Sequence, residues 1–359
     1  MKLFFKKGGG PSTLTVRLWE FTGSALLGLL VFVIAAVYLS PLVYMLFTSV
    51  KGSAQLNDLQ APLYPAVNPQ FNYQGKDYPV MVMPTADGEK EWAMITPRRG
   101  YADFIDPQNP GRGPIRWNGN WRALRKAYHF SITLEAFIPL LKSARIFTGL
   151  VNTLLLVLIT EIGVLLSSIA VAYGFSRFRI PGGKWLFLLL VAAILIPGSA
   201  TRLPTYFIFM KLGWLGSWYP LILPYFFGSA TCIFLLRQNF KSIPRDLDEA
   251  AMLDGAGPLQ ILIKIILPQS IPVIATIALL HFFYIWNETT LASLYIGTQP
   301  DLQPFSFVVQ NDMVSYGSAL TSYAGVEAHA LVLLVVPAVV LLLCQRFFMQ
   351  DMIVTGLEK

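Results

Sequence analysis

Charged residues are scarce in this chain. Only 13% of its 359 residues are Asp, Glu, Lys or Arg, whereas 55% are hydrophobic. Soluble domains carry about 25% charged residues, so the composition excludes an ordinary soluble protein and indicates a membrane protein. The net charge of +7 does not indicate a nucleic-acid partner, because many of the basic residues border apolar segments. Lys and Arg at such positions typically set membrane topology.

Cysteine pairs and catalytic motifs are also missing. Cys232 and Cys344 both fall in apolar segments, where a thiol behaves as a small hydrophobe, so a disulfide framework is not expected. The chain lacks G-x-x-x-x-G-K-[ST], H-E-x-x-H and G-x-S-x-G motifs. Gly182-Gly183-Lys184 has neither the Ser or Thr nor the upstream Gly of a phosphate loop. We therefore expect no catalytic residue, no metal site and no cofactor bound by this chain itself.

Long apolar segments are abundant. Six of them have the length of a membrane span: about 22–48, 149–173, 185–208, 217–239, 265–290 and 328–349. A span needs roughly 20 mostly apolar residues, and in lipid its backbone must form its own hydrogen bonds. The sequence therefore predicts an all-α polytopic membrane protein with six transmembrane helices. The first run is too long for a signal-peptide core, so we expect an uncleaved span.

The basic residues indicate an orientation. If the N-terminus is cytoplasmic, the inner side holds most of the Lys and Arg of the short loops, including Arg177, Lys184, Lys241 and Lys264. The loop at 297–326 on the other side has none. By the positive-inside rule both termini are predicted to be cytoplasmic.

The long segment after the first span is then extracytoplasmic. Asp87-Gly88 lies between the apolar runs 80–83 and 92–95, a pattern typical of a β-hairpin, and Gln74-Gly75 favours another turn. We predict a small β-rich insert at about 60–118, followed by amphipathic helix at about 120–146. Such a small module has a limited core of its own.

These boundaries give three expected parts. Residues 1–50 form the cytoplasmic N-terminus and first span, 51–146 the extracytoplasmic insert, and 147–359 a five-helix core. The core contains a cytoplasmic loop at 242–268 and ends in a cytoplasmic tail.

The loop at 242–268 is polar and patterned. Pro244 suits a helix start, and Asp246, Asp248 and Glu249 crowd the positive end of the helix dipole. Leu247, Ala250, Ala251 and Asp254 share one face of that helix, and Gly255 and Gly257 favour a turn after it. A helix lying on lipid would have a large apolar face and a basic polar face. This acidic, Ala-rich helix better fits a docking surface for another protein.

The loop carries a specific resemblance. It matches the signature of binding-protein-dependent ABC transporter permeases, Glu-Ala-Ala, three residues, Gly, nine residues, Ile, one residue, Leu-Pro, at Glu249, Ala250, Ala251, Gly255, Ile265, Leu267 and Pro268. Trp286-Asn287-Glu288, Asn152-Thr153, the run 172–177 and the tail 345–359 resemble the carbohydrate-uptake members, such as the smaller membrane subunit of maltose-type transporters. Asp351 departs from the Gly common in that tail, and residues 52–130 are not covered.

The resemblance implies a multi-subunit machine. A second, homologous permease subunit would pair with this chain in the lipid of a bacterial or archaeal cell membrane. Two ATPase subunits, which bind the ATP and Mg, would dock below, and a solute-binding protein outside. The short helix would be the coupling helix that carries motion from the ATPase. The residues implied in coupling are Glu249, Ala250, Ala251, Asp254, Gly255, Ala256 and Pro268.

Polar residues within spans are expensive and are candidates for a solute pathway. Glu161 lies midway along the second span, and Tyr284, Trp286, Asn287 and Glu288 end the fifth. Aromatic rings beside polar groups suit a sugar. A structural alternative is open for each, namely an interior acid for Glu161 and an aromatic belt at the membrane interface for the cluster. His281 is better explained as structural.

The resemblance implies a permease for sugars or oligosaccharides, not an enzyme. A polyol or glycerol phosphate is an alternative substrate, although the spans hold almost no Lys or Arg for a phosphate, apart from Arg202. A proton-coupled secondary transporter using Glu161 is a further alternative. A membrane enzyme would need converging polar groups, and the sequence offers scattered acids instead.

Overall fold

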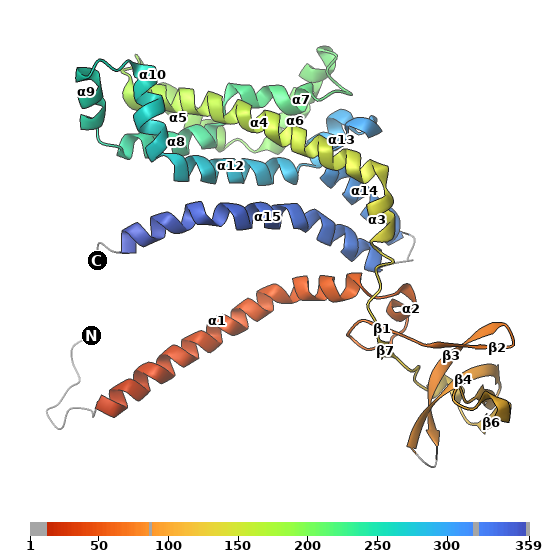
Figure 1. Ribbon diagram of the computed structural model, residues 1–359. Coiled ribbons are helices and arrows are strands. Elements are labelled where there is room, and N and C mark those ends of the chain that lie inside the picture. The colour runs from red at the N-terminus through yellow and green to blue at the C-terminus, as the bar shows by residue number, and fades with distance from the viewer. Residues whose placement is uncertain (1–12, 86–87, 319–322, 357–359) are drawn as a thin grey trace. The chain divides into compact units, whose positions relative to one another are not determined.

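The computed structural model describes residues 13–85, 88–318 and 323–356, and it divides the chain into two compact units. Residues up to Leu134 form the first unit, and residues from Glu135 onward form the second. The first contains one long helix and a β-rich insert, and the second is helical (Figure 1). Each unit is described by itself.

The first unit begins with the long helix α1, Thr13–Ser49. Its apolar stretch, Phe21–Ser49, buries none of its most apolar window within the chain, and Phe21, Leu26 and Tyr38 are more than 70% exposed. A helix that is apolar all round needs lipid or another chain around it. This is the first of the candidate membrane spans.

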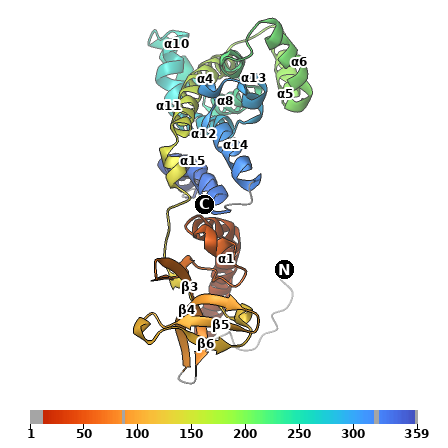
Figure 2. The ribbon, with the colours of Figure 1, turned by 90° about the vertical axis from the view of Figure 1, so that its right-hand side faces the viewer.

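The insert is a β-rich module, as predicted. Its elements are α2 (Ser53–Leu56), β1 (Ala66–Val67), β2 (Gln70–Tyr73), β3 (Lys76–Thr85), β4 (Gly88–Arg98), β5 (Tyr101–Ile105), η1 (Pro110–Arg112), β6 (Ile115–Asn118), η2 (Trp121–Ala123) and β7 (His129–Phe130). The strands β2 to β6 form an antiparallel meander in sequence order, of which β3 to β6 are labelled in Figure 2. Strand β1 pairs with β7.

Alternation along β3 explains the two faces of this sheet. Val80 packs on one face with Ala93, whereas Met81 and Met83 pack on the other with Phe104. Successive side chains of a strand point to opposite faces, so both faces carry a small apolar core.

The predicted turns agree with the strand register. Val80 pairs with Ala93 and Thr85 with Gly88, although residues 86–87 of this hairpin lie outside the described residues. At the β2–β3 turn, Gln74 and Gly75 have φ of 53° and 81°, as a tight hairpin of this hand requires.

The helix predicted at about 120–146 is wrong for most of its length. Residues 125–127 run alongside β3 instead, since Val82 N donates to Arg125 O (2.8 Å) and Ala127 N donates to Val80 O (3.0 Å). Strand β2 pairs with β3 only as far as Pro79. The next residues of β3 therefore have a free edge, and their backbone groups form hydrogen bonds with residues 125–127. Helical structure is limited to the turn η2, the short helix α3 (Ile138–Lys142) and the start of the next helix.

The second unit is all helical. Its elements are α3, α4 (Ala144–Arg177), α5 (Gly183–Ile194), α6 (Gly198–Lys211), α7 (Tyr219–Ile222), η3 (Leu223–Phe227), α8 (Ala230–Ser242), α9 (Asp246–Leu253), α10 (Pro258–Ile261), the π-helical turn η4 (Leu262–Ile266), α11 (Leu267–Gln269), α12 (Ile271–Trp286), α13 (Thr290–Ile296), η5 (Pro300–Leu302), α14 (Phe305–Ser318) and α15 (Tyr323–Gly356).

The candidate spans fall on the predicted apolar segments. Four helical stretches of the described chain are long and apolar enough to cross a membrane: Phe21–Ser49, Ala144–Arg177, Tyr219–Ser242 and Ala324–Gln345. Two further pairs are bent, Gly183–Ile194 with Gly198–Lys211 by 97° and Pro258–Gln269 with Ile271–Trp286 by 78°. The described chain therefore offers four spans, or up to six if each bent pair is one span.

Helix α4 is the centre of the second unit and packs against α8, α12 and α14. A Cβ added at Gly149 would lie 3.2 Å from the Phe305 backbone. Small residues allow such close helix contacts in membrane proteins. One end of the unit carries α9 and α10, and the opposite end carries α13 (Figure 1).

Candidate functional site

The short helix predicted in the loop at 242–268 is present as α9. Asp246, Asp248 and Glu249 occupy its first turn, where the helix dipole favours negative charge. Gly255 follows the end of the helix, and its φ of 81° is the left-handed conformation that glycine adopts without strain. Ala256 N then donates to Ala251 O (2.9 Å), which closes the turn. The residues from Glu249 to Ala256 are thus one compact structure.

The outer surface of α9 is more apolar than its sequence indicates. Leu247, Met252 and Leu253 are 41%, 55% and 90% exposed, and Glu249 and Ala250 are exposed as well. Ala251 packs inward against a core that includes Leu236 and Phe240. The face predicted to be shared by Leu247, Ala250 and Ala251 is therefore divided between a free surface and the core.

Helix α9 is tied to the last turn of α4. Arg177 Nε lies 2.8 Å from Asp248 Oδ2, with side chains only 7% and 10% exposed. A second Arg177 nitrogen donates to Ile243 O (3.1 Å), and the Tyr173 hydroxyl donates to Pro258 O (2.9 Å). The sequence indicated Asp248 only as a dipole partner. Its pairing with Arg177 depends on a contact across 71 positions that no local pattern shows.

Pro268 is not part of this cluster. It lies in α11, after the π-helical turn η4 and before the bend into α12. Proline has no N–H to donate and commonly coincides with such irregular turns. The structure thus brings six of the seven predicted coupling residues together and leaves Pro268 in a separate element.

Trp286 lies in the core of the unit. It is 1% exposed, its ring stacks 5.7 Å from Phe282, and its Nε1 donates to Leu333 O (3.2 Å). Its ring also contacts Phe305 at 5.4 Å. A side chain held on all sides in this way has no free ring face for a solute.

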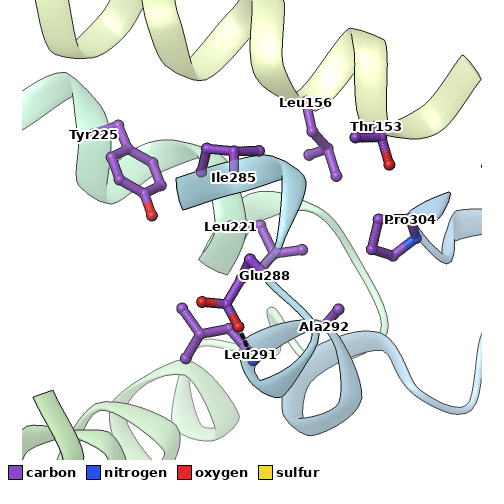
Figure 3. A pocket seen from close by; sticks show the side chains of 9 residues that line it. All are labelled: Thr153, Leu156, Leu221, Tyr225, Ile285, Glu288, Leu291, Ala292 and Pro304. Carbon is purple, nitrogen blue, oxygen red and sulfur yellow. Dashed lines mark hydrogen bonds between the residues drawn. The ribbon is translucent and has the colours of Figure 1, made fainter. Parts of the chain in front are cut away.

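Glu288 lines a small pocket. Its Oε1 accepts a hydrogen bond from Leu291 N (2.7 Å) at the start of α13. Figure 3 shows the carboxylate beside Leu221, Leu291 and Ala292, in a cavity of about 20 Å³. Such a cavity holds about one water molecule. In this conformation the pocket is too small for a sugar ring.

Tyr284 lines a larger cavity, of about 370 Å³. Small-molecule sites typically have about 300–1,000 Å³. The lining residues come mainly from α8 and α12: Tyr225, Ser229, Thr231, Cys232, Leu235, Ile277, Leu280, His281 and Tyr284. His281 Nε2 lies 3.2 Å from Thr160 Oγ1, and its ring contacts Tyr225 edge-on. The hydroxyls at 225, 229 and 231 were missed, because single hydroxyls in a span are common.

Asn287 and Glu161 lie elsewhere. Asn287 lines a third cavity, of about 440 Å³, with Ser306 and Gln310. Neither carboxylate oxygen of Glu161 has a hydrogen-bond partner among the described residues, although both are buried. The five predicted pathway residues therefore do not form one site. Asn287 lines a cavity apart from the others, whereas Tyr284 and Glu288 line two cavities that share Tyr225.

No cluster of three or more His, Cys, Asp or Glu that could hold a metal occurs within 13–85, 88–318 and 323–356. Of the tail singled out in the sequence, the backbone is helical to Gly356, and residues 357–359 lie outside the described part.

Comparison with known proteins relates the chain to membrane transport components. Its residues 153–358 match the family described as "Binding-protein-dependent transport system inner membrane component". It is 29% identical over 259 residues to the osmoprotective compounds uptake permease protein GgtD of Synechocystis sp., covering 71% of this chain and 85% of that protein. It is 30% identical to the sn-glycerol-3-phosphate transport system permease protein UgpE of Pectobacterium atrosepticum, covering 57% and 72%.

A solved structure supports the fold. A chain from the crystal structure of a bacterial ABC transporter involved in the import of the acidic polysaccharide alginate matches with a TM-score of 0.64. The sequence identity is 19%, and the match covers 95% of this chain and 100% of the other. The family match covers more than half of the chain and confirms the resemblance seen in the loop at 242–268. The chain belongs to the binding-protein-dependent transport system inner membrane components, the permease subunits of ABC transporters.

Proposed function

We propose that this chain forms half of the translocation pathway of an ATP-driven importer for sugars or oligosaccharides. The observation that carries the proposal is the geometry of α9. It is a short helix with an exposed apolar and acidic surface, and a buried ion pair joins it to the central helix α4. Such a helix can rest in a cleft of a partner ATPase and pass its motion to the spans. ATP and Mg bind to that ATPase, and this chain performs no chemistry.

Two substitutions on α9 test this role. Glu249→Lys and Gly255→Asp change the exposed surface and the turn, and a side chain at φ 81° is strained. In the transporter assembled with its ATPase, we expect both to lower ATPase association or to abolish uptake, while the protein still inserts. Glu89→Lys, an exposed acid of the insert, is the control. Normal uptake by both variants would refute the assignment.

The proposed machine has further subunits. A second, homologous permease pairs with this chain, two ATPases bind at α9 and its counterpart, and a solute-binding protein delivers the solute from outside. ATP binding closes the ATPases and opens the pathway outward, and hydrolysis resets it. Co-purification with the products of neighbouring genes is the direct measurement. Recovery of this chain without an ATPase would contradict the assembly.

The proposed topology has six spans, with each bent helix pair crossing once and both termini cytoplasmic in a bacterial or archaeal membrane. It is supported by the basic residues around α9. Single cysteines at Asn109 in the insert and Asp254 after α9, in a background without Cys232 and Cys344, test it. An impermeant thiol reagent added outside should label position 109 and not position 254. The reverse pattern would overturn the orientation.

The proposed solute path includes the cavity beside Tyr284. The phenol of Tyr284 suits the apolar face of a sugar, and the hydroxyl groups of Tyr225 and Thr231 suit the hydroxyls of a sugar. Tyr284→Ala should lower uptake while ATPase association stays normal. Trp286 is better assigned to the core. If uptake is unchanged in Tyr284→Ala, the path lies elsewhere, for example at Asn287.

A phosphorylated or polyol substrate is the second candidate. One observation favours the phosphate, namely the similarity to permeases named for sn-glycerol-3-phosphate. Competition of uptake by a neutral oligosaccharide, a polyol and glycerol phosphate separates the classes. Arg202→Gln should weaken uptake only of the phosphate. Uptake that follows the proton gradient and fails in Glu161→Gln would instead support proton coupling.

The insert is proposed to receive the solute-binding protein or to brace the partner permease. Two guanidiniums lie over aromatic rings on it. Arg116 lies over Tyr101 at 4.6 Å and already pairs with Asp103 at 3.3 Å, and Arg122 lies over Trp121 at 5.0 Å. The stacked guanidinium of Arg122 is well placed to meet a carboxylate of another protein. Deletion of 60–118 should reduce uptake, and Arg122→Glu should reduce it in part. Unchanged uptake and assembly after the deletion would exclude both roles.

A further inference from the structure

The last turn of α4 holds the α9 segment at several places. Arg177 pairs with Asp248 inside α9, and its other nitrogen donates to Ile243 O before α9. The Tyr173 hydroxyl donates to Pro258 O after α9. One turn of a central helix thus contacts the beginning, the middle and the end of the segment.

The chain also connects α9 to its neighbours. After α9, a Cβ added at Gly255 or Gly257 would meet nothing within 4 Å, but Ala256 between them packs on the core. Before α9, Ile243 is buried in that core, whereas Pro244 and Arg245 are exposed. A push on α9 can therefore reach the spans through these connections and through its side-chain contacts with α4.

The Arg177–Asp248 pair differs in burial from the other ion pairs of the described residues. Its side chains are 7% and 10% exposed, whereas the Arg125–Glu89 pair is 70% and 67% exposed. A buried pair adds little net stability, but it fixes geometry, and loss of one partner leaves an uncompensated charge. Asp248 Oδ1 and Arg177 Nε have no hydrogen-bond partner among the described residues, so the attraction between the two charges is the main compensation for their burial.

We propose that the Arg177–Asp248 ion pair is the mechanical link through which α9 moves α4, and through α4 the helices α8, α12 and α14 that pack on it. This inference rests on the proposed role of α9 as the ATPase-docking helix. Both residues act as positioning residues, since neither lies at any of the three cavities described above.

The test uses the complete transporter in proteoliposomes, with ATP hydrolysis and solute uptake measured on the same sample. Asp248→Asn keeps side-chain size, Arg177→Gln shortens the side chain, and each removes one charge. We expect each to retain the ATPase and its basal hydrolysis, while solute moved per ATP falls about tenfold. The exchanged pair, Arg177→Asp with Asp248→Arg, should recover part of the loss, because coupled residues are not additive. Partial recovery is not expected if each residue only fills space.

A matched control is available at the same contact. Arg245 donates to Ser176 O (3.4 Å) but forms no ion pair with any residue that the structure describes, so Arg245→Gln should leave solute per ATP nearly unchanged. If Arg177→Gln does not accumulate, Tyr173→Phe decides, because it removes a single hydroxyl from the same attachment. Partial uncoupling in Tyr173→Phe supports the link, and unchanged coupling overturns it.

The outcomes separate this inference from the proposed function. Normal solute per ATP in both Arg177→Gln and Asp248→Asn overturns the link but leaves α9 as a docking helix. Loss of the ATPase from these two variants also overturns it, because the pair would then place α9 rather than transmit its motion. If Glu249→Lys and Gly255→Asp transport normally, the docking role of α9 itself fails.

Discussion

The insert and the helical unit are ordered by different interactions. In the insert, short strands carry a small apolar core on each face, and single polar side chains tie the loops, as Gln55 does. In the helical unit, stacked aromatic rings around Trp286 and one buried ion pair at Arg177 hold the helices. Charge in the insert is mostly at the surface, whereas charge in the helical unit is expensive wherever it occurs. The same substitution should therefore have a different effect in each unit.

The family match follows the same division. It begins at residue 153 and includes α9 and the later spans, but not the insert. The signature that indicates a function thus lies in the helical unit. The fold of the insert is predicted by its alternating strands and its turn residues. Its role can be inferred only from the side chains on its surface.

The largest expected effect is in the aromatic core. Trp286→Ala removes the ring that stacks on Phe282 and contacts Phe305, and truncation of a buried Trp costs about 3–5 kcal/mol. We expect a large fall in the thermal stability of the purified protein in detergent, with the insert still resistant to protease.

The control for this variant is Trp185→Ala, because Trp185 is 70% exposed in the chain. Its stability should stay near that of the unaltered protein. If Trp286→Ala loses uptake but keeps its stability, Trp286 belongs to the solute path after all, and the difference between the units is smaller than described.

The second effect is local to the insert. Gln55 is buried, its amide nitrogen donates to Pro62 O and Tyr64 O, and its oxygen accepts from Ala66 N. Gln55→Ala leaves these groups without partners, at a cost of about 1–3 kcal/mol. Limited proteolysis of the full-length protein should then cut near residues 57–65.

Asn72→Ala is the matched control, since Asn72 is exposed and bonds only to the Asp77 side chain. Its cleavage pattern should not change. Equal protease sensitivity of both variants would contradict the specific role of Gln55 in holding the loop.

The hairpin shows how much the sequence predicts. The alternation at 80–83 and 92–95 and the pair Gln74-Gly75 predict strands and turns, because period and turn chemistry are local properties. The helix expected at 120–146 fails for the opposite reason. Its backbone bonds to Val80 and Val82, some 45 positions away, and no local pattern reports that partner.

The site shows the same limit. The α9 signature is local and predicts a compact docking helix. The ion pair of Asp248 with Arg177, and the burial of Trp286 beside Phe305, depend on how distant helices pack. A Trp-Asn-Glu run has the residue types of a sugar site. Packing nevertheless divides it between the core and two cavities.

A smaller, pH-dependent effect is expected at Asp58. Burial alone would raise the pKa of its carboxyl, but hydrogen bonds from Gln60, Tyr128 and Lys126 hold that pKa below its usual value. A folded-state pKa below the unfolded one stabilises the insert above the unfolded pKa of about 4. That stabilisation is lost as the pH falls through the lower folded-state pKa.

Protease resistance of the insert, measured from pH 6 to pH 3, should therefore fall toward the acidic end. This pH range brackets the ordinary Asp pKa of about 4. Asp58→Asn should remove most of this dependence, and Asp77→Asn, at an exposed position, should not. An identical profile in Asp58→Asn and the unaltered protein would mean that another acid controls the insert.

The smallest effect is expected at Arg125, and it completes the comparison. Arg125 lies 3.6 Å from Glu89 with both side chains about two-thirds exposed, and such pairs contribute about 0–1 kcal/mol. Arg125→Gln removes the same charge that Arg177→Gln removes from the buried pair at α9. In the insert variant, uptake, ATPase coupling and protease resistance should all stay within error of the unaltered protein. A loss of coupling in Arg125→Gln as large as in Arg177→Gln would show that burial does not distinguish the two pairs. The insert would then act on transport through its surface charge.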